Sequence, residues 1–163
     1  MSHKIPDTIT EEELKQIVRG IKNHKKKLAY MLGFYQCMRV SEVVALKSDN
    51  VDINRRFIYI KDAKGGKDRN IPIAPEVLKG LRYLPVGGTR RALQYSFKKT
   101  SKEIIGKDLS FHSLRHSGAT HYLNKKKWNI RAVQQFLGHA RLTTTQIYTH
   151  INNEELLKEM WKE

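Results

Sequence analysis

The stretch VDINRRFIYIKDAKGGKDRNIPI, residues 51–73, decides the fold class of this chain. Residues 51–53 and 57–62 are rich in β-branched and aromatic side chains, and residues 69–73 alternate polar with apolar ones. Between the last two runs lies Lys64-Gly-Gly-Lys, a strong hairpin signal. The pattern predicts a small antiparallel sheet of about three strands.

On both sides of this stretch the apolar residues recur at helical spacing instead. Thr10 followed by Glu13 is a capping box for the first helix, Ser41 is a candidate cap for the third, and residues 23–27 read as a basic connector. Helices are expected over residues 10–22, 28–36, 41–46, 76–83, 90–105, 113–125, 130–137, 143–150 and 154–162. We therefore expect one α+β domain over residues 1–163, mainly helical, with one small three-stranded antiparallel sheet.

The charge balance points to a polyanionic partner. Among 163 residues, 31 are Lys or Arg and 16 are Asp or Glu, which gives a formal net charge of +15. Such a surplus repels itself unless a polyanion is bound, and nucleic acid is the common polyanion for a basic domain. A basic surface kept for solubility or ribosome contact is the alternative.

Several kinds of protein are disfavoured by the composition. A single cysteine, Cys37, permits no intrachain disulfide. The longest apolar run, residues 28–35, is too short to span a bilayer, and the first thirty residues lack a signal-peptide pattern. We expect a soluble protein with no membrane partner, located in the cytoplasm at the nucleoid, or in the host cytoplasm if the chain is viral.

Four short segments carry candidate chemistry: CMRVSE at 37–42, AKGGKDR at 63–69, HSLRHS at 112–117, and LGH at 137–139 with Tyr148 nine residues later. In this order they resemble the tyrosine recombinase, or phage integrase, family. HSLRHSGATH and LGHARLTTTQIYTH are especially similar to the family's motifs, and the resemblance extends from about Thr10 to the C-terminus. Each motif alone is weak, but the ordered set is specific.

The resemblance implies an integrase-type catalytic domain that cleaves and rejoins DNA strands through a 3′-phosphotyrosyl intermediate at Tyr148, without metal, ATP or another cofactor. Arg39 and Arg115 would hold the non-bridging oxygens of the scissile phosphate, a role that suits the planar guanidinium. His112 would accept the tyrosine proton or bind the phosphate, and its spacing from Arg115 places both on one helix face. His139 would donate a hydrogen bond to the same phosphate.

Lys64 is the expected general acid for the leaving 5′-oxygen. Lys67, three residues further on, is a rival. The family's Gly-Lys-Gly motif favours Lys64, although Ala63 replaces its first glycine here. Glu42 is expected to orient Arg39. Further DNA contacts are expected, mainly to phosphates, at these residues: Lys25, Lys26, Lys67, Arg69, Lys125 and Lys126.

Three other interpretations can be weighed: a zinc site, a type IB topoisomerase and a non-catalytic DNA-binding protein. His112 and His116 are four residues apart and could suggest zinc, but the pattern of a His-Glu-x-x-His site and a nearby third ligand are absent from the sequence, so no metal site is expected. A type IB topoisomerase shares the same Arg, Lys, Arg and Tyr chemistry. A non-catalytic DNA-binding protein that retains the fold would have no use for Tyr148 at this spacing.

Partners and domain organisation follow from the resemblance. The partner would be double-stranded DNA, with a free monomer or weak dimer and a tetramer in the full synaptic complex. The C-terminal segment 151–163 could pack on its own domain or be exchanged between protomers. Only 38 residues precede Arg39, so the family's N-terminal core-binding domain is expected to be absent, in a fragment or in an unusually short protein. The target site and the direction of recombination stay open.

Overall fold

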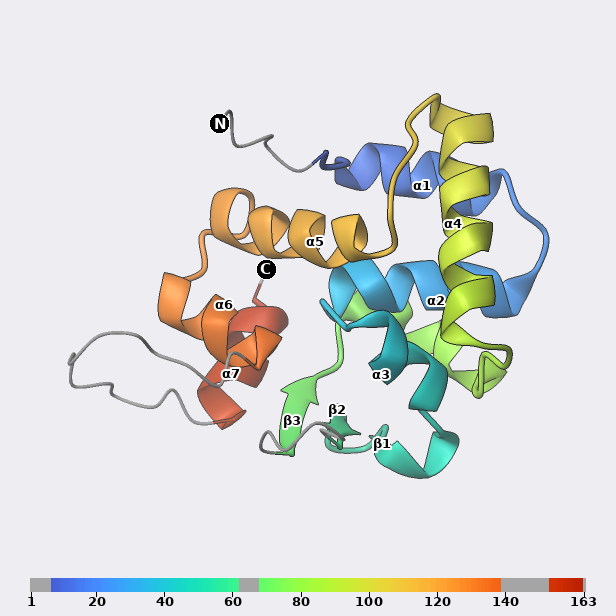
Figure 1. The fold of residues 1–163 in the computed structure, drawn as a ribbon. Helices are drawn as coiled ribbons and strands as arrows, with labels where there is room; N and C mark the ends of the chain where they lie inside the picture. The colour runs from blue at the N-terminus through green and yellow to red at the C-terminus, as the bar shows by residue number, and fades with distance from the viewer. Residues whose placement is uncertain (1–6, 62–67, 139–152, 163) are drawn as a thin grey trace.

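The computed structural model describes residues 7–61, 68–138 and 153–162 (Figure 1). In chain order the elements are α1 (Glu11–Arg19), α2 (His24–Tyr35), α3 (Val40–Ala45), the 3₁₀ helix η1 (Ser48–Asn50), β1 (Val51–Asp52), β2 (Phe57–Ile60), β3 (Arg69–Pro72), the 3₁₀ helix η2 (Pro75–Tyr83), α4 (Arg90–Ile105), α5 (His112–Asn124), α6 (Ile130–Leu137) and α7 (Asn153–Met160). The predicted mainly helical α+β architecture is confirmed. The predicted helix over 143–150 lies outside the described residues.

Helix α2 differs most from its prediction, since it begins four residues before the expected residue 28. The side chain of Asn23 accepts hydrogen bonds from the backbone N–H groups of Lys25 (3.0 Å) and Lys26 (3.1 Å). An asparagine cap of this kind satisfies N–H groups that have no partner inside the helix. The predicted connector over 23–27 was therefore wrong, and Lys25 and Lys26 lie in the first turn of α2.

The element η2 also departs from its prediction. An α-helix was expected over residues 76–83, and the structure has 3₁₀ winding that starts at Pro75. Gly80, in the middle of this segment, weakens α-helix formation by about 1 kcal/mol relative to alanine. It also lies against Leu28, whose Cδ1 would be 3.1 Å from an added Cβ, so a larger residue would push η2 away from α2.

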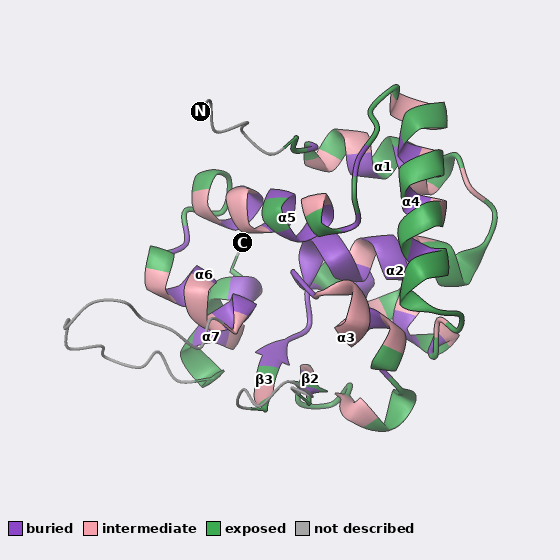
Figure 2. Ribbon diagram, in the orientation of Figure 1, coloured by how far each residue is buried: buried purple, intermediate pink, exposed green. Residues whose placement is uncertain are grey.

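Helix α2 is the centre of the core, packed between α5 and η2 (Figure 2). Its residues Leu28, Leu32 and Phe34 are almost completely buried. The crossing with α5 is close, because a Cβ at Gly118 would lie only 1.9 Å from the carbonyl oxygen of Phe34. Only glycine permits this approach, which fixes α5, and the His112 and Arg115 side chains it carries, against the most buried helix.

The sheet has the strand order β1-β2-β3, and both pairings are antiparallel. Ile58 pairs with Ile71, and both side chains face the core, while the neighbouring pair Tyr59 and Asn70 is exposed. The buried amide of Gln36 ties this sheet to the end of α2. Its Nε2 donates to the carbonyl of Pro72 (2.9 Å) and its Oε1 accepts from the N–H of Ala74 (2.5 Å).

Helix α7 packs on its own domain, beside β3. Leu156 and Met160 are buried, and the indole Nε1 of Trp161 donates to the carbonyl of Ile73 (3.0 Å). The guanidinium carbon of Arg56 lies 3.8 Å from the centre of the Trp161 ring, which adds a cation–π contact. In this single chain the C-terminal helix thus covers the sheet of the same molecule, and its exchange between protomers stays a prediction.

In the described part of the chain, no helix is both long and apolar enough to span a bilayer.

Candidate active site

His112 and Arg115 lie at the start of α5, one turn apart. His112 is exposed, whereas Arg115 retains only 4% of its accessible surface. Arg115 Nη1 donates to the carbonyl of Cys37 (2.7 Å), and its Nη2 donates to the carbonyl of Leu137 (2.9 Å). The guanidinium thus joins the segment after α2 to the end of α6, and the N–H groups not used by these two bonds remain as donors.

Cys37 takes the left-handed backbone conformation, with φ of 51°, at the point where its carbonyl accepts from Arg115. A non-glycine residue in this region is strained and is kept there only by its surroundings. Its side chain is buried, and burial raises the pKa of the thiol to about 12. Cys37 therefore serves as a packed turn residue and stays protonated at neutral pH.

Arg39 is the N-cap residue of α3 and is the accessible arginine of the site, with 41% of its side chain exposed. Its own N–H donates to Glu42 Oε1 (2.8 Å), and its Nη1 lies 3.6 Å from Glu42 Oε2. The predicted cap at Ser41 was wrong, because the N-cap is Arg39, two residues earlier, and the Glu42 carboxylate accepts from the Arg39 N–H. The expected contact between Glu42 and Arg39 exists, mainly through the Arg39 backbone.

Arg39, Arg115 and His112 come from neighbouring segments, because Arg115 donates to the carbonyl of Cys37, two residues before Arg39, and His112 lies one turn before Arg115. Burial and the positive charge of Arg39 lower the pKa of Arg115 to about 10, so Arg115 is still a cation at neutral pH. Partial burial and the charges of Arg115, His116 and Arg39 lower the pKa of His112 below its ordinary value. The positive charges of Arg39 and Arg115 repel each other, and a bound anion would relieve this repulsion. Because its pKa is lowered, His112 is a neutral base at neutral pH.

Arg69 is not the open surface residue expected of a DNA contact. Its side chain is only 11% exposed, and its Nη1 and Nη2 donate to the two carboxylate oxygens of Glu42 (2.8 and 3.3 Å). Burial raises the pKa of the Glu42 carboxyl, but the hydrogen bond and charge of Arg69, with the Arg39 N–H, lower it below its ordinary value. The sequence could not show this pairing because 27 residues separate the partners.

The structure brings together Arg39, Glu42, Arg69, His112 and Arg115. Four other predicted site residues, Lys64, Lys67, His139 and Tyr148, lie outside the described residues. Within residues 7–61, 68–138 and 153–162, no three His, Cys, Asp or Glu side chains are grouped so that they could hold a metal ion.

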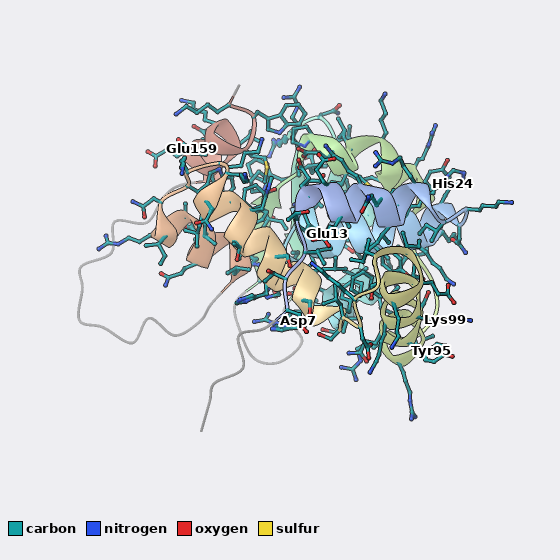
Figure 3. All side chains as sticks on the ribbon, turned by 90° about the horizontal axis from the view of Figure 1, so that it is seen from above. Asp7, Glu13, His24, Tyr95, Lys99 and Glu159 are labelled. Carbon is teal, nitrogen blue, oxygen red and sulfur yellow. The ribbon has the colours of Figure 1, made fainter. Side chains whose placement is uncertain are left out.

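Four of the lysines predicted to contact DNA lie in the described part of the chain, and they line two separate hollows that contain no residue of this cluster. Lys25 and Lys26 line a hollow of about 530 Å³ together with Tyr95 and Lys99 of α4. Figure 3 shows Tyr95 and Lys99 on the outer side of α4, and Tyr95 is 69% exposed. Sequence reasoning missed these two residues, although the basic polar face of α4 was visible in the sequence.

Lys125 and Lys126, at the other end of α5, line a hollow of about 650 Å³ that also contains Glu11 and Glu12. The acidic side chains reduce the attraction of this hollow for phosphate. The hollow beside Lys25 and Lys26 has a third lysine, Lys99, and one acidic residue, Glu103, so the two lysine pairs have different electrostatic surroundings.

Comparison with known proteins decides the family. Residues 7–155 match the model of the phage integrase family. The chain belongs to this family. Tyrosine recombinase XerA of Pyrococcus horikoshii is 34% identical over 93% of this chain and 59% of its own length, and tyrosine recombinase XerD of Ralstonia nicotianae is 34% identical over 94% and 58%. The chain thus spans about three fifths of the length of these phage integrase relatives.

Solved structures agree with this assignment. The crystal structure of a XerA recombinase superposes with a TM-score of 0.77 at 29% identity and covers 98% of this chain and 65% of that one. An integrase from mycobacterium phage Brujita superposes with a TM-score of 0.82 at 20% identity, over 98% of this chain and 58% of that one. The second likeness shows the fold alone, which is the predicted integrase-type catalytic domain.

Proposed function

We propose that this chain is the catalytic domain of a site-specific DNA recombinase that cleaves and rejoins strands through Tyr148. The observation that carries the proposal is the meeting of the segments that bear Arg39, His112 and Arg115. Arg115 donates to the carbonyl of Cys37, two residues before Arg39, and His112 lies one turn before Arg115 on α5. Relatives that are 34–38% identical to this chain are named tyrosine recombinases, which supports the same function. Double-stranded DNA is the proposed substrate.

In the proposed reaction, the Tyr148 phenolic oxygen attacks the scissile phosphorus. A bond forms between phosphorus and this oxygen, and the bond from phosphorus to the 5′-oxygen breaks. His112 accepts the phenolic proton, which its lowered pKa permits because the imidazole is neutral near pH 7. Lys64 gives a proton to the leaving 5′-oxygen, so that a free 5′-hydroxyl results. His139 donates a hydrogen bond to the phosphate.

Arg39 and Arg115 stabilise the negative charge that develops on the non-bridging oxygens. Fixed donors of this kind accelerate a reaction because they need no reorganisation as charge develops. The phosphotyrosyl ester keeps the energy of the broken bond, so a 5′-hydroxyl from another strand can attack it without ATP. No step requires a metal ion.

Self-association on DNA belongs to the same proposal. A lambda integrase tetramer bound to a Holliday junction shares the fold, with a TM-score of 0.68 at 18% identity. We propose a tetramer for the complete synaptic complex and a monomer or weak dimer for the free chain, acting in the cytoplasm.

A nicked duplex that traps the covalent adduct tests the function. Because the target site is unknown, a pool of nicked duplexes with randomised arms is used, and adducts that resist denaturation are isolated. Wild-type protein should yield an adduct, and Tyr148→Phe should yield none while still binding DNA.

Two outcomes would redirect the proposal. DNA binding by the wild type with no adduct from the pool would favour the non-catalytic DNA-binding protein. An adduct accompanied by supercoil relaxation, with no strand exchange between two selected sites, would favour a type IB topoisomerase.

A further inference from the structure

The geometry points to Arg69 as a positioning residue for strand cleavage, rather than a DNA contact, an inference that rests on the proposed function. Arg69 is the first residue of β3 and pairs across the sheet with Ile60 of β2. Its side chain leaves the sheet and is largely buried, with two hydrogen bonds to the carboxylate of Glu42. A two-point contact of a planar fork with a carboxylate fixes both distance and orientation.

The partner carboxylate is itself fixed to the segment that presents Arg39. Glu42 is 7% exposed, and the oxygen that accepts from Arg69 Nη2 also accepts from the Arg39 N–H. Through Glu42, the strand β3 and the first turn of α3 are therefore held at a fixed separation. A buried carboxylate without its cation is strongly unfavourable, so this arrangement resists displacement.

A third segment lies directly against the same side chain. A Cβ built at Gly138 would be 2.8 Å from the Cδ, Nε and Cζ atoms of Arg69. Gly138 ends α6 in the left-handed conformation, with φ of 74°, and follows Leu137, whose carbonyl accepts from Arg115. Arg69 thus contacts the end of α6 at the residue where only glycine leaves room for it.

The three segments that meet at Arg69 contain, precede or follow three of the six proposed catalytic residues. Along the chain, Lys64 precedes Arg69 by five residues, Arg39 caps α3, and His139 follows Gly138 directly. Displacement of reacting groups by about 1 Å can slow a reaction on the order of 10²-fold. With its guanidinium engaged by Glu42 and covered by Gly138, Arg69 sets the relative positions of the start of β3, the first turn of α3 and the end of α6.

The substrate is a nicked duplex selected through its covalent adduct with the wild-type protein. The experiment measures its single-turnover cleavage by Arg69→Gln at saturating DNA. It also measures the dissociation constant of the protein–DNA complex at several salt concentrations. We expect the cleavage rate to fall on the order of 10²-fold, with the dissociation constant and its salt dependence unchanged. Arg69→Lys, which keeps the charge and loses the fork, should be intermediate. The matched control is Arg55→Gln, because Arg55 is 84% exposed in the turn before β2, and its cleavage rate should equal that of the wild type.

Folding is checked by thermal unfolding of each variant. If Arg69→Gln unfolds because Glu42 is left unpaired, the double variant Glu42→Gln, Arg69→Gln removes both buried charges and should still cleave slowly. A larger dissociation constant for DNA with a shallower salt dependence, together with a wild-type cleavage rate at saturating DNA, would overturn the inference in favour of a phosphate contact. An unchanged rate in a folded variant would also overturn it. Absence of an adduct with wild-type protein would instead overturn the proposed function, and this inference with it.

Discussion

Two arginines of the candidate site, Arg115 and Arg39, belong to regions with opposite physical character. Arg115 is buried in α5 and bonded to two backbone carbonyls, so it is part of the framework that holds α2 and α6 together. Arg39 is exposed at the start of α3, and its guanidinium has only a long contact to Glu42. Of the two arginines proposed to hold one phosphate, therefore, only Arg115 is also part of the framework of the fold.

The largest expected effect comes from Arg115→Met, which keeps the bulk of the side chain and removes its hydrogen bonds. The carbonyls of Cys37 and Leu137 would be left buried without their donor, at about 1–3 kcal/mol each. We expect the free energy of unfolding to fall by about 3 kcal/mol, and the cleavage rate to fall on the order of 10³-fold. Denaturant unfolding and single-turnover cleavage measure the two effects.

The same substitution at the exposed position, Arg39→Met, should separate them. Surface ion pairs contribute little, so we expect the free energy of unfolding to change by less than about 0.5 kcal/mol. The cleavage rate should still fall on the order of 10²-fold, because a donor to the developing charge is lost. Equal losses of stability in the two variants would contradict the proposal that Arg115 supports the fold and the exposed Arg39 does not.

Two glycines that end helices, Gly138 after α6 and Gly106 after α4, allow the contact between Arg69 and the end of α6 to be tested. Gly138 and Gly106 have similar left-handed φ values of 74° and 70°, but an added Cβ meets Arg69 at Gly138 and nothing within 4 Å at Gly106. Alanine at either position should cost about 1–2 kcal/mol of stability from backbone strain. Only Gly138→Ala should also slow cleavage, and equal cleavage by both variants would argue against the contact with Arg69.

The pH dependence follows from the lowered pKa of His112. A histidine whose pKa is lower in the folded than in the unfolded protein binds fewer protons when folded, so stability is lost as pH falls below the ordinary value of about 6.5. His121, buried beside Glu11, also has a lowered pKa and adds to this loss. The midpoint of thermal unfolding should decrease between pH 7.5 and pH 5.5, and His112→Gln should weaken that decrease. A variant with the full wild-type decrease would contradict the assignment to His112.

The smallest effects concern the lysines outside the cluster. Lys26→Gln should lower the salt dependence of DNA binding by about 0.9 in logarithmic slope, the change for one lost phosphate contact. Lys126→Gln should have a smaller effect, because its hollow also contains Glu11 and Glu12. The salt slope of the dissociation constant for each variant measures this, and the reverse order would place the DNA path along the far end of α5.

The elements that the sequence predicted best are those whose signals are local. Helices α4 and α6 lie over the predicted residues, because each has a side-chain cap at its start, Thr89 or Asn129, and a glycine at its end. The start of α2 was missed although its signal was equally local, because the lysines after Asn23 were interpreted as a connector.

For the candidate site, the residues could be named from the sequence, but their surroundings could not. That His112 and Arg115 share a helix face was predictable from their spacing. The acceptors of Arg115 were not, because backbone carbonyls carry no residue signature. The burial of Arg69 depends on long-range packing of β3, α3 and the end of α6, which no local pattern records.

The docking of α7 gives this molecule an optical reporter. The sequence contains two tryptophans, of which Trp128 is buried against Tyr122 and Phe136, while Trp161 is held between Ile73 and Arg56. In a Trp128→Phe protein, Trp161 would be the sole indole emitter. A helix that leaves its own sheet for bulk water on meeting DNA would shift the emission to longer wavelength and admit acrylamide, whereas a helix that stays in place would keep its spectrum.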